Sequence, residues 1–316
     1  MSGSEGLNLR VQSITYQTEQ IVVFELCDPE FEPLPPSEAG SHMDVELGNG
    51  LVRSYSIVEV RNPISYRIAV AREDSGRGGS RWLHDHVSVG DMLRVSLPRN
   101  NFALSPQGSH SVLIAGGIGI TPIFAMLQQL EADERSWELH YSTRSRLSTA
   151  FYRELSCDFR HGKVTFYHPK ADGRFVELNV IVLTRPADSH LYCCGPARMI
   201  DAFLAATSGL PSDLVHVERF GGVTETATGA FDVILARSRK TVRVQEGTTI
   251  LGCLLAAGID VPHSCQEGVC GACETKLLDG VADHRDLIQS GAEKAKNTSI
   301  FVCCSGSMTP SLTLDL

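Results

Sequence analysis

Long apolar runs, an apolar leader and an excess of basic charge are all absent from this 316-residue sequence. No stretch reaches the roughly eighteen apolar residues that a transmembrane helix needs, so we expect no membrane span. The opening residues, MSGSEGLNLR, lack the apolar segment of a secretory signal, so we expect a cytoplasmic protein. The 28 Lys and Arg are outnumbered by 37 Asp and Glu, and the net charge of −9 argues against a nucleic-acid partner.

The composition is otherwise that of a folded chain. Apolar residues make up 42% and charged residues 21% of the sequence, which is enough to bury a core and excludes a disordered chain. At roughly 100–200 residues per domain, the length predicts two or three domains.

Short strands dominate the first hundred residues. The candidates are separated by turns and lie at 10–16, 20–26, 43–47, 53–58, 66–72 and 92–97. Many short strands with little helical pattern predict an antiparallel β-barrel or sandwich.

Strands and helices alternate from about residue 108. Strand candidates lie at 111–115, 137–142, 163–168, 190–195 and 215–220, with helical segments at 121–133, 148–155 and 196–208. In the first of these helices, Thr121 suits the N-cap and Pro122 the first helical position. The alternation predicts an α/β domain with a doubly wound parallel sheet.

The last part of the chain follows a small, polar segment at 221–230, which we interpret as a linker. Residues 231–236 and 241–245 alternate about a charged turn, as the strands of a hairpin do. Residues 248–258 predict a helix, and a cysteine-rich loop comes after it.

Six of the ten cysteines follow residue 250, and their spacing is specific. Cys265, Cys270 and Cys273 have the pattern C-x4-C-x2-C, and a distant Cys303 completes four thiolates, as in plant-type 2Fe–2S ferredoxins. A zinc site is the alternative, although zinc ribbons pair two C-x2-C knuckles and this chain has one. The fourth ligand stays open at this point, because Cys304 adjoins Cys303.

Two glycine-containing turns each follow a strand and open a helix. The first, AGGIGITP, contains Gly116, Gly117 and Gly119, which would let a pyrophosphate approach the helix N-terminus. The second contains Cys194, Gly195 and Pro196. Because ligands bind at the carboxyl ends of strands in open α/β sheets, both turns could line one crevice. A plain tight turn and a buried Cys194 are the structural alternatives.

A flavin site is suggested by two elements of the all-β region. In the strand RSYSIV, Arg53 offers a charged fork of donors, Tyr55 a flat ring and Ser56 a small hydroxyl. Alternation places Arg53 and Tyr55 on one face and Ser54 and Ser56 on the other. The glycine-rich segment 75–83, with Gly78, Gly79 and Ser80, could form an anion-binding nest or a surface loop.

Redox chemistry connects these candidate sites. Nicotinamide delivers a hydride, which is two electrons at once, whereas a 2Fe–2S cluster takes one electron at a time. A flavin accepts a hydride and releases single electrons, so a chain with both end sites requires a flavin between them.

The cysteine segment resembles the plant-type ferredoxins, whose last ligand stands two residues before Ala or Ser. Ser305 lies two residues after Cys303, so the resemblance implies Cys303 as ligand and Cys304 as a bystander.

Taken over nearly its whole length, the sequence resembles the phthalate dioxygenase reductase family. The family's R-x-Y-S motif matches Arg53 to Ser56, its phosphate loop Gly78 to Ser80, its G-G-x-G-x-T-P turn Gly116 to Pro122, and its C-G-P motif Cys194 to Pro196. The resemblance implies FMN, NADH and a 2Fe–2S cluster, with Cys194, Ser56 and Phe220 at the reacting rings.

The resemblance also implies the organisation and the role of the protein. Its expected domains are an FMN-binding antiparallel barrel at 1–107, an NAD-binding α/β domain at 108–224 and an α+β ferredoxin domain of the β-grasp type at 225–316. NADH is implied by the family alone, since Arg144 and Arg146 could tolerate a 2′-phosphate.

The expected partner is a Rieske-type aromatic-ring or demethylating oxygenase. The alternatives are a diiron or haem hydroxylase, a ferric chelate, or a zinc-stabilised docking module without redox activity.

Overall fold

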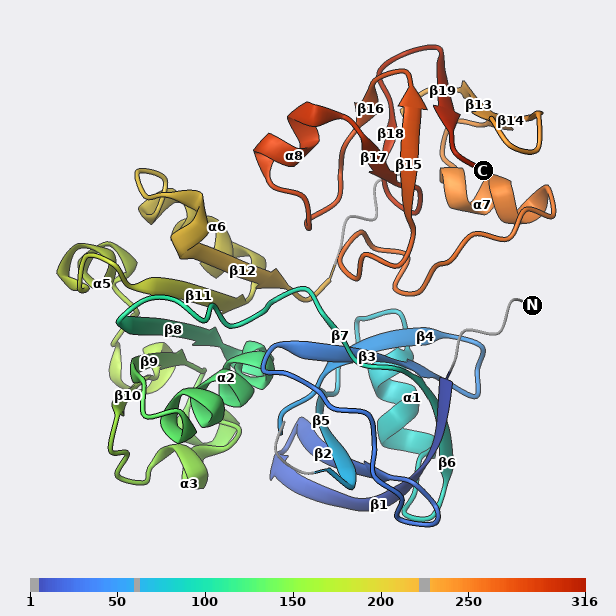
Figure 1. The fold of residues 1–316 in the computed structure, drawn as a ribbon. Helices are drawn as coiled ribbons and strands as arrows, with labels where there is room; N and C mark the ends of the chain where they lie inside the picture. The colour runs from blue at the N-terminus through green and yellow to red at the C-terminus, as the bar shows by residue number, and fades with distance from the viewer. Residues whose placement is uncertain (1–5, 60–62, 222–227) are drawn as a thin grey trace. The chain divides into compact units, whose positions relative to one another are not determined.

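The computed structural model describes residues 6–59, 63–221 and 228–316, so most of the expected linker lies outside the described residues. The chain divides into two compact units, one that ends at Phe220 and one that runs from Gly221 to Leu316 (Figure 1). Within the described ranges, no helix is both long and apolar enough to cross a membrane.

The first part of the longer unit is an antiparallel β-barrel. Its strands lie in the order β4-β3-β6-β1-β2-β5, and β7 pairs with β3. A bridge between Ile57 and Ile68 joins the end of β4 to β5 and closes the sheet. This confirms the barrel rather than the sandwich. The elements are β1 (Gly6–Thr18), β2 (Ile21–Cys27), β3 (Ser41–Glu46), β4 (Val52–Ser56), β5 (Ser65–Ala71), α1 (Gly79–His86), β6 (Met92–Ser96) and β7 (Arg99–Asn100).

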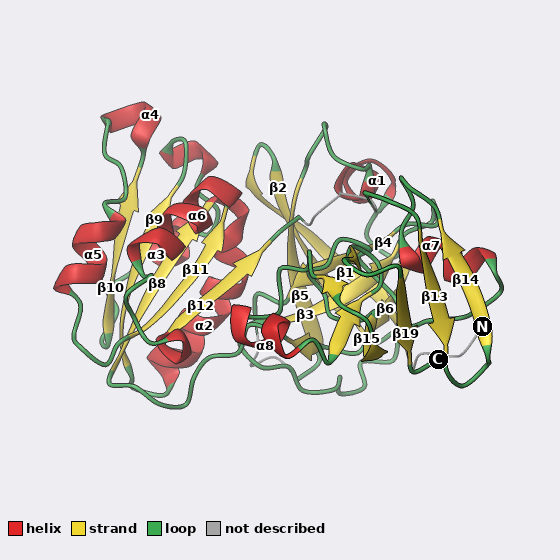
Figure 2. Cartoon of the chain, turned by 90° about the horizontal axis from the view of Figure 1, so that it is seen from above, coloured by secondary structure: helices red, strands yellow, loops and turns green. Residues whose placement is uncertain are grey.

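The second part is a five-stranded parallel sheet with the order β10-β9-β8-β11-β12, as predicted (Figure 2). Helices α2 and α3 cover one face, and α5 and α6 the other (Figure 1). The elements are β8 (His110–Gly116), α2 (Ile120–Ala132), β9 (Ser136–Ser142), α3 (Tyr152–Leu155), β10 (Gly162–Tyr167), α4 (Pro169–Asp172), α5 (Leu178–Thr184), β11 (His190–Gly195), α6 (Ala197–Ala206) and β12 (Val215–Arg219).

Two local expectations for this sheet need correction. Thr121 is not the N-cap, because a 3-10 turn over Gly117–Gly119 leads directly into α2 and the Thr121 hydroxyl donates to the Ile118 carbonyl. The helix expected at 148–155 is confined to α3, because Phe151 has φ of 57° and its ring stacks on Phe124. Helix α5 was not predicted. Its β-branched run has low helix propensity, which packing against the sheet and α6 overrides.

The barrel and the parallel sheet share one hydrophobic core. Val58, Ala69 and Phe102 of the barrel segment pack in the same buried cluster as Ile120 and Cys194 of the sheet segment. Burial of this apolar surface holds the end of β4 beside the start of α2 and the end of β11. The candidate flavin and nicotinamide elements therefore belong to one packed unit.

The shorter unit is an α+β domain whose mixed sheet has the order β14-β13-β19-β15-β17, with a small second sheet of β16 and β18. The hairpin of β13 and β14 and the helix α7 were predicted. The elements are β13 (Phe231–Leu235), β14 (Lys240–Val244), α7 (Ile250–Ala256), β15 (Glu274–Asp279), β16 (Ala282–Asp283), α8 (Gly291–Lys296), β17 (Ser299–Phe301), β18 (Gly306–Ser307) and β19 (Ser311–Leu314).

Candidate functional site

The N-terminus of α1 and the arginine of β4 form the first part of the site. Gly78 precedes α1 with φ of 82°, and no acidic side chain lies in the first helical turn. A Cβ atom on Gly79 would come within 2.6 Å of Arg53 Cγ, so the arginine side chain lies directly against this helix end. The guanidinium and the helix N-terminus are both positive, and an anion between them would stabilise the arrangement. These donors fit the phosphate of a flavin mononucleotide.

Ser80, the third residue of the predicted phosphate loop, forms a local hydrogen bond in this structure. The Ser80 hydroxyl accepts a hydrogen bond from the Glu73 N–H at 3.1 Å, which ties the start of α1 to the preceding loop. The Arg53 guanidinium donates to the Arg77 carbonyl at 3.3 Å. Both hydrogen bonds fix the conformation of the loop between Arg53 and the start of α1.

Ser56 lies on the opposite face of β4 from Arg53 and Tyr55. The register pairs Ser56 with His42 and Tyr55 with Met43 across β3 and β4, as side-chain alternation predicted. In the described chain, the Ser56 hydroxyl and both ring nitrogens of His42 are buried without a hydrogen-bond partner. Unpartnered buried polar atoms are costly, so this pair fits a place where a bound ring supplies hydrogen bonds.

The protonation state of His42 follows from its surroundings. Burial, and then the charge of Arg99, lower the pKa of His42 to about 4. The imidazole is therefore neutral at pH 7 and offers one donor and one acceptor.

The two glycine-containing turns meet at the switch point of the parallel sheet. Strands β8 and β11 are neighbours at the point where the strand order reverses, which is where open α/β sheets bind ligands. A Cβ atom on Gly119 would lie 2.3 Å from the Cys194 carbonyl oxygen, and one on Gly116 would lie 2.6 Å from Pro196 Cδ. Gly116 and Gly119 thus serve the close contact between the turns, whereas Gly117 is open. The structure brings both motifs into contact at this switch point.

Glu218, which sequence analysis did not single out, lies beside Cys194. The parallel register of β11 and β12 pairs these residues, and the Cys194 thiol is 4.0 Å from Glu218 Oε2. Burial raises the pKa of Glu218 to about 8. Burial, and then the charges of Glu218 and Cys193, raise the pKa of the Cys194 thiol well above its ordinary value. Both groups are uncharged at neutral pH, and the Cys194 side chain is fully buried in the core, as its structural alternative predicted.

The raised pKa of Glu218 predicts a pH effect on stability. The neutral carboxyl contributes stability fully below its unfolded pKa of 4.5, and this contribution is lost as pH rises through about 8. Between pH 6.5 and 9, Tm should therefore fall more for the wild type than for Glu218→Gln. Glu154→Gln, which changes an exposed carboxylate, should keep the wild-type profile. Parallel profiles for the wild type and Glu218→Gln would contradict the assignment.

Four further residues that the sequence singled out lie in this unit. Phe220 follows β12 and is 42% exposed, so its ring is accessible to a bound group. Arg144 and Arg146 are exposed after β9, and the Arg146 guanidinium lies 4.5 Å from the Tyr152 ring centroid. Pro122 lies in the first turn of α2, next to Thr121.

The four candidate cluster ligands, Cys265, Cys270, Cys273 and Cys303, come together in the shorter unit as two pairs. The thiols of Cys265 and Cys270 form one hydrogen-bonded pair and those of Cys273 and Cys303 the other, and the Cys303 thiol also hydrogen-bonds to that of Cys304. The antiparallel pairing of β15 with β17, extended by the Val302 N–H to the Cys273 carbonyl, puts the second pair side by side. Among the described residues, no group of three His, Cys, Asp or Glu is arranged to hold one metal ion. Two pairs of thiolates fit a two-iron cluster.

Backbone amides of the cysteine loop point at these sulfur atoms. The Glu267 N–H donates to Cys265 Sγ at 3.3 Å, and the Gly268 N–H donates to the Cys303 sulfur. Gly268 and Gly271 have φ of 71° and 79°, the left-handed conformation expected for tight turns. Such amide hydrogen bonds stabilise negative charge on a cluster.

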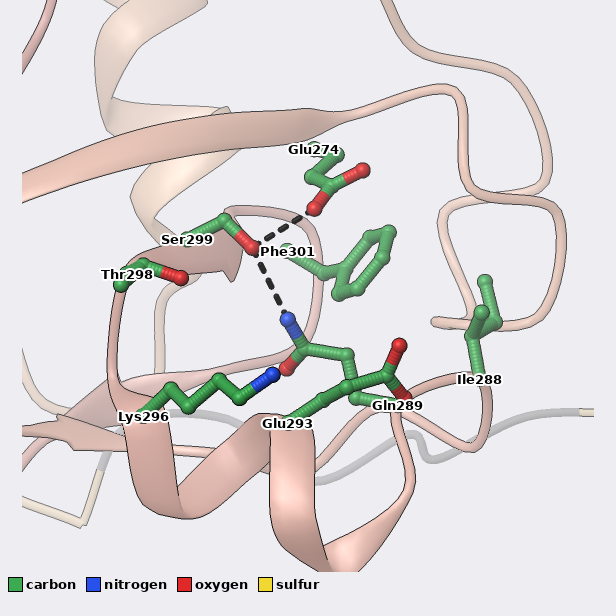
Figure 3. A pocket seen from close by; sticks show the side chains of 8 residues that line it. All are labelled: Glu274, Ile288, Gln289, Glu293, Lys296, Thr298, Ser299 and Phe301. Carbon is green, nitrogen blue, oxygen red and sulfur yellow. Dashed lines mark hydrogen bonds between the residues drawn. The ribbon is translucent and has the colours of Figure 1, made fainter.

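A pocket of about 330 Å³ opens beside the strands that carry two of the ligands (Figure 3). Glu274 directly follows Cys273 and pairs with Phe301 across β15 and β17. The Ser299 hydroxyl donates to Glu274 at 2.6 Å and accepts from the Gln289 amide at 2.9 Å. Glu293 and Lys296 of α8 complete a lining of mixed charge.

Comparison with known proteins agrees with this geometry. Residues 233–306 match the family described as 2Fe-2S iron-sulfur cluster binding domain. Phenoxybenzoate dioxygenase subunit beta of Ectopseudomonas oleovorans is 44% identical, over 98% of this chain and 97% of the relative. Phthalate dioxygenase reductase of Burkholderia cepacia is 41% identical, over 98% of this chain and 97% of the relative.

A solved structure of phthalate dioxygenase reductase is also similar. It is described as a modular structure for electron transfer from pyridine nucleotides to a 2Fe–2S centre. It is 39% identical, with a TM-score of 0.75, and the match covers 99% of this chain and 98% of that chain. The similarity therefore extends over the barrel, the parallel sheet and the cysteine-bearing unit.

Proposed function

This chain belongs to the phthalate dioxygenase reductase family, and from that membership we propose that it is the NADH-dependent reductase component of a Rieske-type oxygenase system. The observation that carries the proposal is the presence, in one chain, of two glycine-containing turns in contact at a sheet switch point and of two thiol pairs in a 2Fe–2S domain. The first site handles two electrons at once and the second handles one.

The chain's own residues bind and orient the redox groups. When bound, FMN supplies the conversion between hydride transfer and single-electron transfer. Arg53 and the N-terminus of α1 hold its phosphate, while Ser56 and His42 offer hydrogen bonds to its ring. Phe220 is accessible to cover that ring.

The nicotinamide end of the crevice is formed by the two turns. Gly117 leaves the helix N-terminus open to the pyrophosphate, and Cys194 with Glu218 supplies an uncharged floor. Cys265, Cys270, Cys273 and Cys303 hold the cluster. The protein accelerates electron transfer by holding the redox groups close together and in the order of transfer. The proposed reaction needs no nucleophile or general acid.

We assign the FMN barrel to residues 1–107, the NAD domain to 108–224 and the ferredoxin domain to 225–316.

The family supports an oxygenase as electron acceptor, since the similar proteins include a phenoxybenzoate dioxygenase subunit and a phthalate dioxygenase reductase. None of the ten cysteines, all of which lie among the described residues, forms a disulfide, which supports a reducing, cytoplasmic setting.

A visible spectrum of the purified protein, followed by titration with NADH without oxygen, tests the proposal. Flavin and iron–sulfur absorption should both be present and should bleach with NADH. Zinc without acid-labile sulfide would instead favour a docking module. Turnover with a Rieske oxygenase, compared with diiron or haem hydroxylases and ferric chelates, identifies the acceptor.

Docking of the acceptor should depend only weakly on salt. From residue 229 onward the chain carries ten acidic and eight basic side chains, a net of −2. The pocket beside the cluster has mixed charge. Coupled turnover should therefore fall by less than about threefold from low to moderate salt, with NADH–ferricyanide turnover as the control for salt effects on the first step. A steep loss of coupled turnover alone would contradict this prediction.

A further inference from the structure

Asp286 is the most deeply buried carboxylate beside the cysteine loop. It is 0% exposed and lies between β16 and α8. One oxygen, Oδ2, accepts the N–H groups of Ile288 at 3.2 Å and Gln289 at 2.8 Å. The other, Oδ1, has no hydrogen-bond partner among the described residues, and His284 Nδ1 lies 3.9 Å from it.

The main chain of Asp286 and Leu287 lies directly against the backbone of the cysteine loop. The Leu287 N–H donates to the Gly268 carbonyl at 3.0 Å, which ties the two loops together. A Cβ atom on Gly268 would come within 3.2 Å of Asp286 Cα and 2.6 Å of Cys304 Sγ. The Gly268 N–H in turn donates to the Cys303 sulfur. Asp286 is thus separated from a cluster ligand by a single residue of main chain.

A purely structural role for Asp286 explains only one of its two carboxylate oxygens. The two N–H groups bound by Oδ2 stabilise the turn that leads to α8. They do not account for a second carboxylate oxygen that is buried without a hydrogen bond, which costs free energy. A charge retained at such a cost next to a redox centre has an electrostatic consequence, because charges interact strongly where water is excluded.

We propose that the Asp286 carboxylate lowers the reduction potential of the 2Fe–2S cluster, and so favours passage of the electron onward to the acceptor. This inference rests on the proposed function. Reduction adds negative charge to the cluster, and a fixed negative charge behind the loop opposes it. Lys294 acts in the opposite sense. Its ammonium donates to the Asp286 carbonyl at 2.5 Å and lies 3.9 Å from Oδ2, so it offsets part of the carboxylate's charge.

The test is a redox titration of the cluster in the full-length holoprotein, monitored by electron paramagnetic resonance. Asp286→Asn keeps the shape and an acceptor for the turn but removes the charge. It should raise the equilibrium constant for cluster reduction about tenfold, which is ~59 mV for a one-electron couple. Lys294→Gln should shift the potential downward. Asp232→Asn, which removes an exposed carboxylate of the same unit, should leave the potential unchanged.

The outcomes separate this inference from the proposed function. A wild-type protein without iron and sulfide would overturn the proposed function itself. Full cluster content with an unshifted potential in Asp286→Asn would overturn only the role of Asp286. Where Asp286→Asn fails to assemble a cluster, Lys294→Gln decides: a lower potential supports the role and an unchanged potential contradicts it.

Discussion

Cys303→Ala is expected to lose the cluster and to reduce cluster-dependent electron transfer by more than about 100-fold. The substitution removes one thiolate of the Cys273–Cys303 pair, so one iron would keep a single cysteine ligand. Iron and acid-labile sulfide content, with the visible spectrum, report assembly. NADH–ferricyanide turnover should persist, because the barrel and the nucleotide crevice belong to the other compact unit.

Cys304→Ala is the matched control for that variant. Cys304 is adjacent in sequence and equally buried, and its thiol contacts Cys303 and lies 3.7 Å from the Phe301 carbonyl oxygen. The ferredoxin resemblance assigns the fourth ligand to Cys303, with Ser305 two residues on, so Cys304→Ala should retain iron and sulfide. Loss of the cluster in Cys304→Ala, with retention in Cys303→Ala, would show that the two neighbours had been assigned the wrong way round.

Arg53→Ala is expected to weaken FMN binding by roughly 10- to 100-fold, the equivalent of about 1.5–3 kcal/mol for charge-assisted hydrogen bonds. The reason is the geometry at α1, where the guanidinium lies against a helix N-terminus that has no acidic residue in its first turn. Flavin content after gel filtration and the Kd for added FMN measure the effect. NADH oxidation should recover when FMN is supplied in excess.

Arg94→Ala provides the control for charge and for barrel stability. Arg94 lies on β6 of the same barrel and forms an exposed ion pair with Glu46, which contributes little to stability. Its removal should leave FMN affinity unchanged. Equal affinities for the wild type and Arg53→Ala would place the phosphate elsewhere.

The contacts of the site that the sequence did not predict all depend on which strands pair with each other. The pairing of Cys194 with Glu218, and of Ser56 with His42, depends on which strands become neighbours and in what register. Neither partner belongs to a recognisable motif. A half-buried carboxyl such as that of Glu218, outside any local motif, looks like an ordinary strand residue until the sheet order is known.

The different contacts of the three glycines in the first turn could not be predicted from the sequence either. Gly116, Gly117 and Gly119 are equivalent in a motif, yet two of them serve the packing of one turn against another and only Gly117 is open. Distinguishing them required the positions of Cys194 and Pro196, which lie far along the chain.

The sequence by itself determined the type of each domain, the helix and strand positions around the two turns, and the cysteine pattern of the cluster. These properties are local, because turn residues, side-chain periodicity and ligand spacing act over a few residues. The tertiary structure alone decided that Arg53 meets a helix end, that Glu218 is held uncharged beside Cys194, and that Asp286 lies behind Gly268. These depend on burial and on contacts between distant segments, which arise only when the sheets are assembled.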